Sequence, residues 1–158
     1  MASNNYAAHL DTSPFEQGQS TTAPPKSVAI GITLLRLSLG SMWIAHALLK
    51  LIVFSLPGTA QYFQSIGFPA YFAYPIFAAE LLGGLAILLG VYARQVSLLL
   101  TPIMIVATWV HMPNGWVHTS VGGGWEYPAF LCAASIVLWL VGGGAFNFRE
   151  SRILTPRI

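Results

Sequence analysis

Six ionisable side chains stand inside otherwise apolar stretches of this 158-residue sequence, and they are its main candidates for chemistry. They are Arg36, His46, Lys50, Glu80, His111 and Glu126. A charged group is costly to place inside a membrane, so such residues there belong by default to buried pairs or to a functional site. Their side chains are suited to proton transfer and to hydrogen bonding with a polar ligand.

The composition indicates that the elements carrying these residues are membrane-embedded. Hydrophobic residues make up 55% of the chain and charged residues 8%, whereas a soluble domain has about 25% charged residues. This composition excludes a disordered protein and a soluble nucleotide-binding fold. The single cysteine, Cys132, excludes a disulfide-stapled secreted domain. The net charge of +2, without a basic run, gives no support for nucleic-acid binding.

Four apolar segments follow one another, at residues 28–54, 71–91, 95–112 and 127–141. A helix needs about 20 apolar residues to cross a bilayer, and the first three segments meet this length. We therefore expect an all-α fold, an integral membrane antiparallel four-helix bundle over residues 27–149. The polar residues 1–26 are predicted to form a disordered tail, and residues 150–158 a short basic tail.

The loop charges predict the orientation of this bundle. The two termini and the turn at residues 90–95 share one side in a four-span topology. The basic residues on that side are Lys26, Arg94, Arg149, Arg152 and Arg157, and Lys50 is the basic residue on the other. Positive charge marks the cytoplasmic side. The protein is thus predicted to be multi-pass with its N- and C-termini in the cytoplasm, in contact with lipid and with a protein partner or further copies of itself.

Counting helical rise from the ends of the apolar segments places Arg36 about 12 Å and Glu80 about 16 Å from the same membrane side. These heights predict a buried Arg36–Glu80 ion pair. Such a pair would fix the helix register. Alternatively, it would serve as a proton relay or as a polar anchor for a quinone head group.

A second group of polar residues is predicted near the outer face. His46 lies about 27 Å and His111 about 24 Å from the cytoplasmic side, and Lys50 is one turn higher, near Glu126. The residues Arg36, Gly40, Trp43, Ala47 and Lys50 share one helical face. We expect an outward-facing pocket formed by Trp43, His46, Lys50, His111, Trp116, His118 and Glu126, of which Trp43, His46, Lys50, His111 and Glu126 are the ligand-binding candidates.

Each of these residues also has a structural explanation. Lys50 would snorkel to the interface, the tryptophans would form an aromatic belt, and Glu126 would complement a helix N-terminus. The spacings His-x-x-x-His and Glu-x-x-His are absent, so no metal site is predicted. Haem ligation by His46 and His111 from different spans is not favoured.

Several of these residues occur in an order that resembles the DoxX family. Residues 35–40 (LRLSLG) with His46 and Lys50 resemble its first helix, residues 80–84 (ELLGG) and 88–90 with Arg94 its second, and His111 with residues 126–128 its third and fourth. The resemblance implies a four-helix bacterial inner-membrane protein. It carries over Arg36, His46, Lys50, Glu80, Arg94, His111 and Glu126. The close of the fourth helix differs: residues 142–144 are three glycines and Asn147 follows, where the family tends to have Gly-Pro-Gly and a later Asp.

The resembled family includes a subunit associated with thiosulfate:quinone oxidoreductase. The apolar bundle and its polar residues leave three alternatives. The first is a quinone-linked oxidoreductase subunit, with quinone as the cofactor and a partner supplying electrons. The second is a non-catalytic scaffold or assembly subunit for a partner enzyme, whose polar pairs stabilise the fold. The third is a small transporter or channel, which four short helices favour less. Function has to be argued from the site rather than from the family.

Overall fold

The computed structural model describes residues 25–151 and 153–156, and these form a helical bundle. The long helices are α1 (Lys26–Leu48), α3 (Ala73–Leu89), α4 (Ala93–His111) and α5 (Glu126–Val141). The short helix α2 (Leu56–Ser65) follows a π-helical turn, η2 (Leu49–Val53), that extends α1. Two 3-10 turns, η3 (Ala70–Phe72) and η4 (Met112–Asn114), precede α3 and follow α4. The predicted all-α fold is confirmed.

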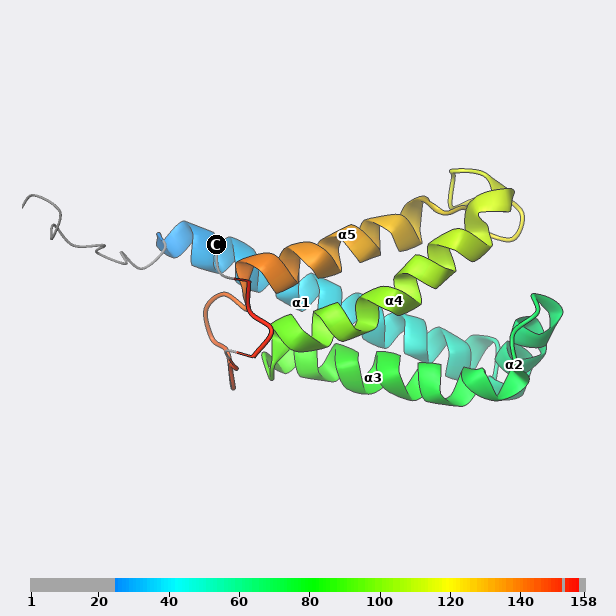
Figure 1. Ribbon diagram of the computed structural model, residues 1–158, viewed down its shortest axis with the longest axis horizontal. Coiled ribbons are helices and arrows are strands. Elements are labelled where there is room, and N and C mark those ends of the chain that lie inside the picture. Colours follow the sequence, from blue (N-terminus) through cyan, green and yellow to red (C-terminus); the bar gives the residue numbers. More distant parts are fainter. Residues whose placement is uncertain (1–24, 152, 157–158) are drawn as a thin grey trace, which may run out of the picture.

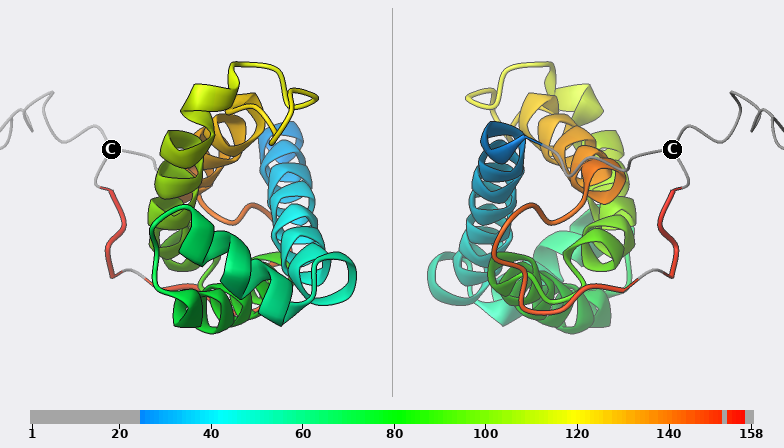
Figure 2. Two further views of the ribbon diagram at one scale, coloured as in Figure 1. Left: turned by 90° about the vertical axis from the view of Figure 1, so that its right-hand side faces the viewer. Right: turned by 90° about the vertical axis from the view of Figure 1, so that its left-hand side faces the viewer.

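The four long helices alternate in direction, as expected for an antiparallel bundle (Figure 1). Viewed from either end, they follow a ring in the order α1, α3, α4, α5 (Figure 2). The most extensive interfaces join α1 to α3 and α4 to α5, and a smaller one joins α1 to α5. Helix α2 lies at the end of the bundle where α1 ends and α3 begins (Figure 1).

Among the described residues, three helical stretches are long and apolar enough to cross a membrane: Lys26–Val53 with 28 residues, Ala70–Leu89 with 20 and Ala93–Asn114 with 22. The fourth, Glu126–Val141, has 16 residues and is shorter, as the sequence predicted. Large apolar side chains on the outside of the bundle, among them Leu82, Leu99 and Phe130, are at least 65% exposed. Such outward-facing apolar surface is typical of a protein whose solvent is lipid.

The described residues differ from the expected tails at the C-terminal end. Residues 1–24 of the predicted N-terminal tail lie outside the described residues, and Lys26 is already the first residue of α1. At the other end, the described residues of 150–158 return to the bundle rather than leaving it. Gln95 of α4, for example, donates hydrogen bonds to the carbonyls of Ser151 (3.0 Å) and Ile153 (2.6 Å).

Helices α1 and α3 approach so closely that glycine is required on both sides of their contact. A Cβ added to Gly40 would lie 2.8 Å from the backbone nitrogen of Leu88, and one added to Gly84 would lie 2.9 Å from the backbone nitrogen of Ile44. Backbone atoms in a packed helix cannot shift as a flexible side chain can. This contact sets the register of α1 against α3, on which the position of every polar residue between them depends.

Gly40→Ala should therefore destabilise the bundle by about 1–3 kcal/mol, the usual cost of overpacking. Gly31→Ala is the matched control, because it lies on the same helix with nothing within 4 Å of the added Cβ. It should gain up to about 1 kcal/mol from helix propensity. Thermal unfolding in one detergent measures both variants. Equal stability of the two would contradict the close approach at Gly40.

Candidate functional site

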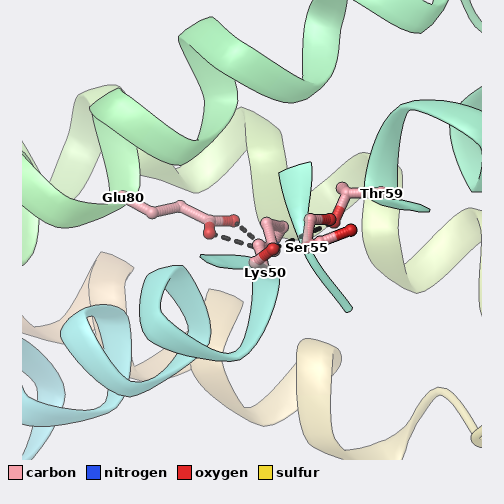
Figure 3. Close-up of polar contacts among 4 residues, drawn as sticks. All are labelled: Lys50, Ser55, Thr59 and Glu80. Carbon is pink, nitrogen blue, oxygen red and sulfur yellow. Dashed lines mark hydrogen bonds and ion pairs between the residues drawn. The ribbon is translucent and has the colours of Figure 1, made fainter. Parts of the chain in front are cut away.

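Glu80 lies in the middle of α3 with 1% of its side chain exposed, and its partner is Lys50. The Lys50 ammonium donates to both carboxylate oxygens, at 2.7 Å to Oε2 and 3.0 Å to Oε1 (Figure 3). The Lys50 side chain is 17% exposed. A charged pair is therefore buried between α1 and α3, with its cationic side reaching towards the surface.

The predicted Arg36–Glu80 ion pair is wrong. Arg36 donates instead to the side-chain oxygen of Asn147 at 2.6 Å and to the carbonyl of Phe146 at 3.3 and 3.4 Å. The prediction counted rise as if residues 28 and 91 stood at one height. A Cβ added to Gly90 would instead collide with the Arg36 guanidinium, so Arg36 lies level with the end of α3. Ten helical residues, about 15 Å, separate that level from Glu80.

The π-helical turn η2 helps to position Lys50. The Phe54 N–H donates to the carbonyl of Leu49, five residues earlier, at 3.0 Å. The Thr59 hydroxyl lies 3.0 Å from the Ser55 carbonyl and 3.5 Å from the Lys50 carbonyl, which ties α2 to this turn (Figure 3). Single π-helical turns inserted in helices occur frequently at functional sites.

The helical face predicted for α1 is largely buried. Arg36, Gly40, Trp43 and Ala47 are all buried, and Lys50 continues the face past the end of α1. The two charged residues of this face have different partners. Arg36 donates to Asn147, which follows α5, and Lys50 pairs with Glu80 on α3.

His46 lies one helical turn before Lys50 and links α1 to α5. Its ring contacts the ring of Tyr127, with centroids 5.1 Å apart and planes inclined by 31°. Tyr127 was not among the predicted candidates. The signal that could have found it is its place at the start of the fourth segment, where an antiparallel bundle brings the end of the first.

Three buried donors on this side of the bundle lack a protein partner. The indole Nε1 of Trp43, the hydroxyl of Tyr127 and the hydroxyl of Ser135 make no hydrogen bond within the described part of the chain. Trp43 and Ser135 are fully buried. An unpaired buried donor costs about 1–3 kcal/mol. The α1–α5 side of the interior is thus suited to a group that offers hydrogen-bond acceptors.

The remaining candidates make their contacts outside this group. Glu126 accepts from the backbone N–H of His118 at 2.8 Å and lies 2.7 Å from its Nδ1, at an exposed site. His111 Nδ1 lies 2.7 Å from the carbonyl of Ala107 on its own helix. Trp116 packs edge-on against Trp125, with centroids 4.4 Å apart.

The seven residues expected in one pocket therefore fall into two groups. Trp43, His46 and Lys50 lie on α1 and η2, and the others lie at the end of α4, in the loop beyond it and at the first residue of α5. Within residues 25–151 and 153–156, no hydrogen bond, ion pair or ring contact joins the two groups. In the same stretches, no three His, Cys, Asp or Glu side chains are grouped closely enough to hold a metal ion.

An all-helical bundle whose apolar helices have membrane-spanning length, with an ion pair held between two of them, defines a multi-pass membrane protein. The chain belongs to the DoxX family, whose family model matches residues 31–113. That match covers α1 to α4, including Arg36, His46, Lys50 and Glu80, and ends before Tyr127. The resemblance seen in the sequence is confirmed, and the protein is a bacterial one.

The chain is also similar to a curated relative. The chain is 40% identical over 82 residues to "Putative oxidoreductase CatD" of Bacillus subtilis (strain 168). The match covers 52% of this chain and 60% of the relative's length. No solved structure matches the chain.

Removing one partner of the buried pair should be strongly destabilising. Lys50→Gln leaves Glu80 without its counter-charge, and breaking a buried pair costs about 3–5 kcal/mol. The double variant Lys50→Gln/Glu80→Gln should recover most of that loss. Equilibrium unfolding in detergent micelles measures the coupling energy.

The matched control is the pair that the sequence predicted. Arg36→Gln and Glu80→Gln should be additive to within about 0.5 kcal/mol, because the two residues share no contact. A stronger coupling of Glu80 with Arg36 than with Lys50 would show that the pairing in the bundle is different.

Proposed function

We propose that this protein is a quinone-linked subunit of a membrane oxidoreductase, located in the bacterial inner membrane. The observation that carries the proposal is the buried Lys50–Glu80 ion pair beside the His46–Tyr127 ring contact. A pair of this kind inside a span is a functional-site hypothesis by default. Membership of the DoxX family and a relative named as an oxidoreductase agree with it.

The residues present fit a quinone. A quinone head group is a flat apolar ring with two carbonyl acceptors. The Trp43 indole and the Tyr127 hydroxyl are buried donors that lack an acceptor, and a carbonyl is the acceptor that each requires. Leu39 and Leu131 belong to the same apolar cluster as Trp43, with Tyr127 packed against it. These groups would hold the ring through apolar contact and orient it through its carbonyls.

The same site contains groups that hold and move protons. A bound quinone supplies two-electron, two-proton redox chemistry. Lys50 Nζ holds protons beside the buried Glu80 carboxylate, and its partly exposed side chain connects that carboxylate with the surface. The His46 ring, one turn along α1, is a second proton carrier next to Tyr127. Electrons would come from a partner protein, as the sequence led us to expect.

The distribution of basic residues supports an orientation for this site. Lys26, Arg94 and Arg149 lie at the end of the bundle where α1 begins, and Lys50 lies towards the opposite end. By the positive-inside rule, both termini would be cytoplasmic. The Lys50–Glu80 pair would then lie in the half of the membrane nearer the outer face, as the polar site predicted from the sequence does.

A second candidate is a scaffold or assembly subunit without a bound cofactor. The observation that favours it is the same ion pair, because Lys50 and Glu80 join α1 to α3 and would hold the two helices in register. On this alternative, the orphaned donors Trp43 and Tyr127 serve no ligand.

The decisive test is the quinone content of protein purified in mild detergent. Organic extraction and mass spectrometry should find about one quinone per chain. Trp43→Phe and Tyr127→Phe should each weaken binding of decylubiquinone or menadione about fivefold to tenfold, since one hydrogen bond is worth about 1 kcal/mol. Calorimetric titration in nanodiscs measures the affinity.

His118→Ala is the control for this experiment, because His118 is an exposed loop residue in contact with Glu126 and should leave quinone affinity unchanged. A quinone-free protein that does not bind either probe, and that co-purifies with another enzyme, would replace the redox subunit by the scaffold.

A further inference from the structure

The residues after α5 form a strap, which we define as residues 145–151 and 153–156. It crosses the end of the bundle where α1 begins and where α3 turns into α4 (Figures 1 and 2). Arg149 forms an isolated parallel bridge with Val91. The N–H of Arg149 donates to the Gly90 carbonyl at 3.1 Å, and the N–H of Tyr92 donates to the Arg149 carbonyl at 2.8 Å. The strap is thus hydrogen-bonded to the turn between α3 and α4.

Side chains of three helices hold the strap by its backbone carbonyls. Arg36 of α1 donates to the carbonyl of Phe146 at 3.3 Å. Gln95 of α4 donates to the carbonyls of Ser151 and Ile153, and the indole of Trp139 in α5 donates to the carbonyl of Leu154 at 2.8 Å. These bonds use the main chain of the strap, so they do not occupy the side chains of Phe146, Ile153 and Leu154.

Two of the carbonyls held in this way belong to strained residues. Phe146 and Leu154 have φ of 58° and 57°, in the left-handed region that bulky residues rarely adopt. Such strain persists only where surrounding contacts enforce it. Here the contacts from Arg36 and Trp139 fall on the strained residues themselves.

The side chains that result are large, apolar and uncovered. Phe146 is 88% exposed, Phe148 84%, Ile153 73% and Leu154 61%. Backbone strain is thus maintained in a segment that buries little of its own apolar surface. In water the exposed apolar side chains would contribute no stabilising free energy to offset this strain. We therefore expect lipid or a protein partner to cover them.

The level of the strap along α1 identifies that medium. The N–H of Ala145 donates to the Thr33 hydroxyl at 2.8 Å, and the Thr33 hydroxyl also lies 3.1 Å from the Ala145 carbonyl. Thr33 is seven residues, about 10 Å, inside the first residue of α1. Over that length α1 exposes Val28 and Ile30. A bilayer that covers these residues also reaches the start of the strap.

The charges near the strap complement an anionic lipid surface. Arg149 is exposed beside Phe148, with its guanidinium 5.6 Å from the centre of the Tyr92 ring. Lys26 is exposed at the same end of the bundle. The acidic residue of the strap, Glu150, accepts a hydrogen bond from the Asn147 amide. Aromatic side chains interspersed with basic ones are typical of the lipid–water interface.

We propose that the strap lies in the lipid–water interface and binds an anionic lipid surface. Phe146, Phe148, Ile153 and Leu154 insert among the upper parts of the acyl chains, and Arg149 and Lys26 contact lipid phosphates. The hydrogen bonds from α1, α4 and α5 hold the strap at this depth. The proposal concerns a face of the protein separate from the Lys50–Glu80 pair and does not depend on the proposed function.

Site-specific fluorescence in nanodiscs tests this placement. The fluorophore NBD is attached to Phe148→Cys or Ile153→Cys in a Cys132→Ala background, and the discs contain phosphatidylcholine with a spin label high on its acyl chain. Both probes should be quenched by the lipid. Reduction by aqueous dithionite should be at least about fivefold slower than at Val121→Cys, because inserted side chains are shielded from water. Val121 is 99% exposed in the loop at the other end and is the matched control.

The lipid charge is tested in the same discs. Replacing part of the phosphatidylcholine by phosphatidylglycerol should increase lipid quenching at residue 148, and Arg149→Gln should reduce that increase. Fast dithionite reduction without lipid quenching would place the strap in water and overturn the proposal. Protection from dithionite without lipid quenching would mean that a protein covers the strap, and would overturn it equally. An unchanged charge effect in Arg149→Gln would remove the role given to Arg149.

Discussion

A carboxylate in the middle of an apolar helix requires the neighbouring elements to place a cationic partner beside it, because a membrane interior stabilises such a charge only through a partner. Glu80 is this carboxylate. Its partner Lys50 has to arrive from α1 at the right height, which requires the backbone contact at Gly40 and Gly84 and the π-helical turn that follows α1. The architecture of α1 and α3 follows from meeting this condition.

The fold could be predicted from the sequence because a bilayer reduces the alternatives so strongly. Long apolar segments in lipid have to be helical, and the short turn at residues 90–92 makes neighbouring helices antiparallel. The ends of the helices agree with those expected to within a few residues. The return of the strap to the bundle could not be predicted, because it depends on hydrogen bonds from Arg36, Gln95 and Trp139 to backbone carbonyls. Every residue has a backbone carbonyl, so the sequence does not indicate which of them accept these bonds.

The site was only partly predictable for a related reason. Residue type identified Lys50, Glu80 and His46 correctly as polar groups inside spans, but their partners depend on relative helix height. Arg36 lies level with Gly90 rather than with Glu80, and this difference in height is enough to exchange Arg36 for Lys50 beside Glu80. Tyr127 was missed because an isolated tyrosine at the start of an apolar segment resembles an ordinary interfacial residue until His46 is placed against it.

The unequal lengths of the spans have a consequence for the bilayer itself. Helix α5 has 16 residues, about 24 Å of rise, whereas the stretch from Lys26 to Val53 has 28. Helix α5 is therefore shorter than a typical hydrocarbon core of about 30 Å, and its neighbour α1 with η2 is longer. Hydrophobic mismatch of this kind is accommodated by local thinning of the bilayer beside a short span and by tilting of a long one. We therefore expect the bilayer around this protein to differ in thickness between α5 and α1.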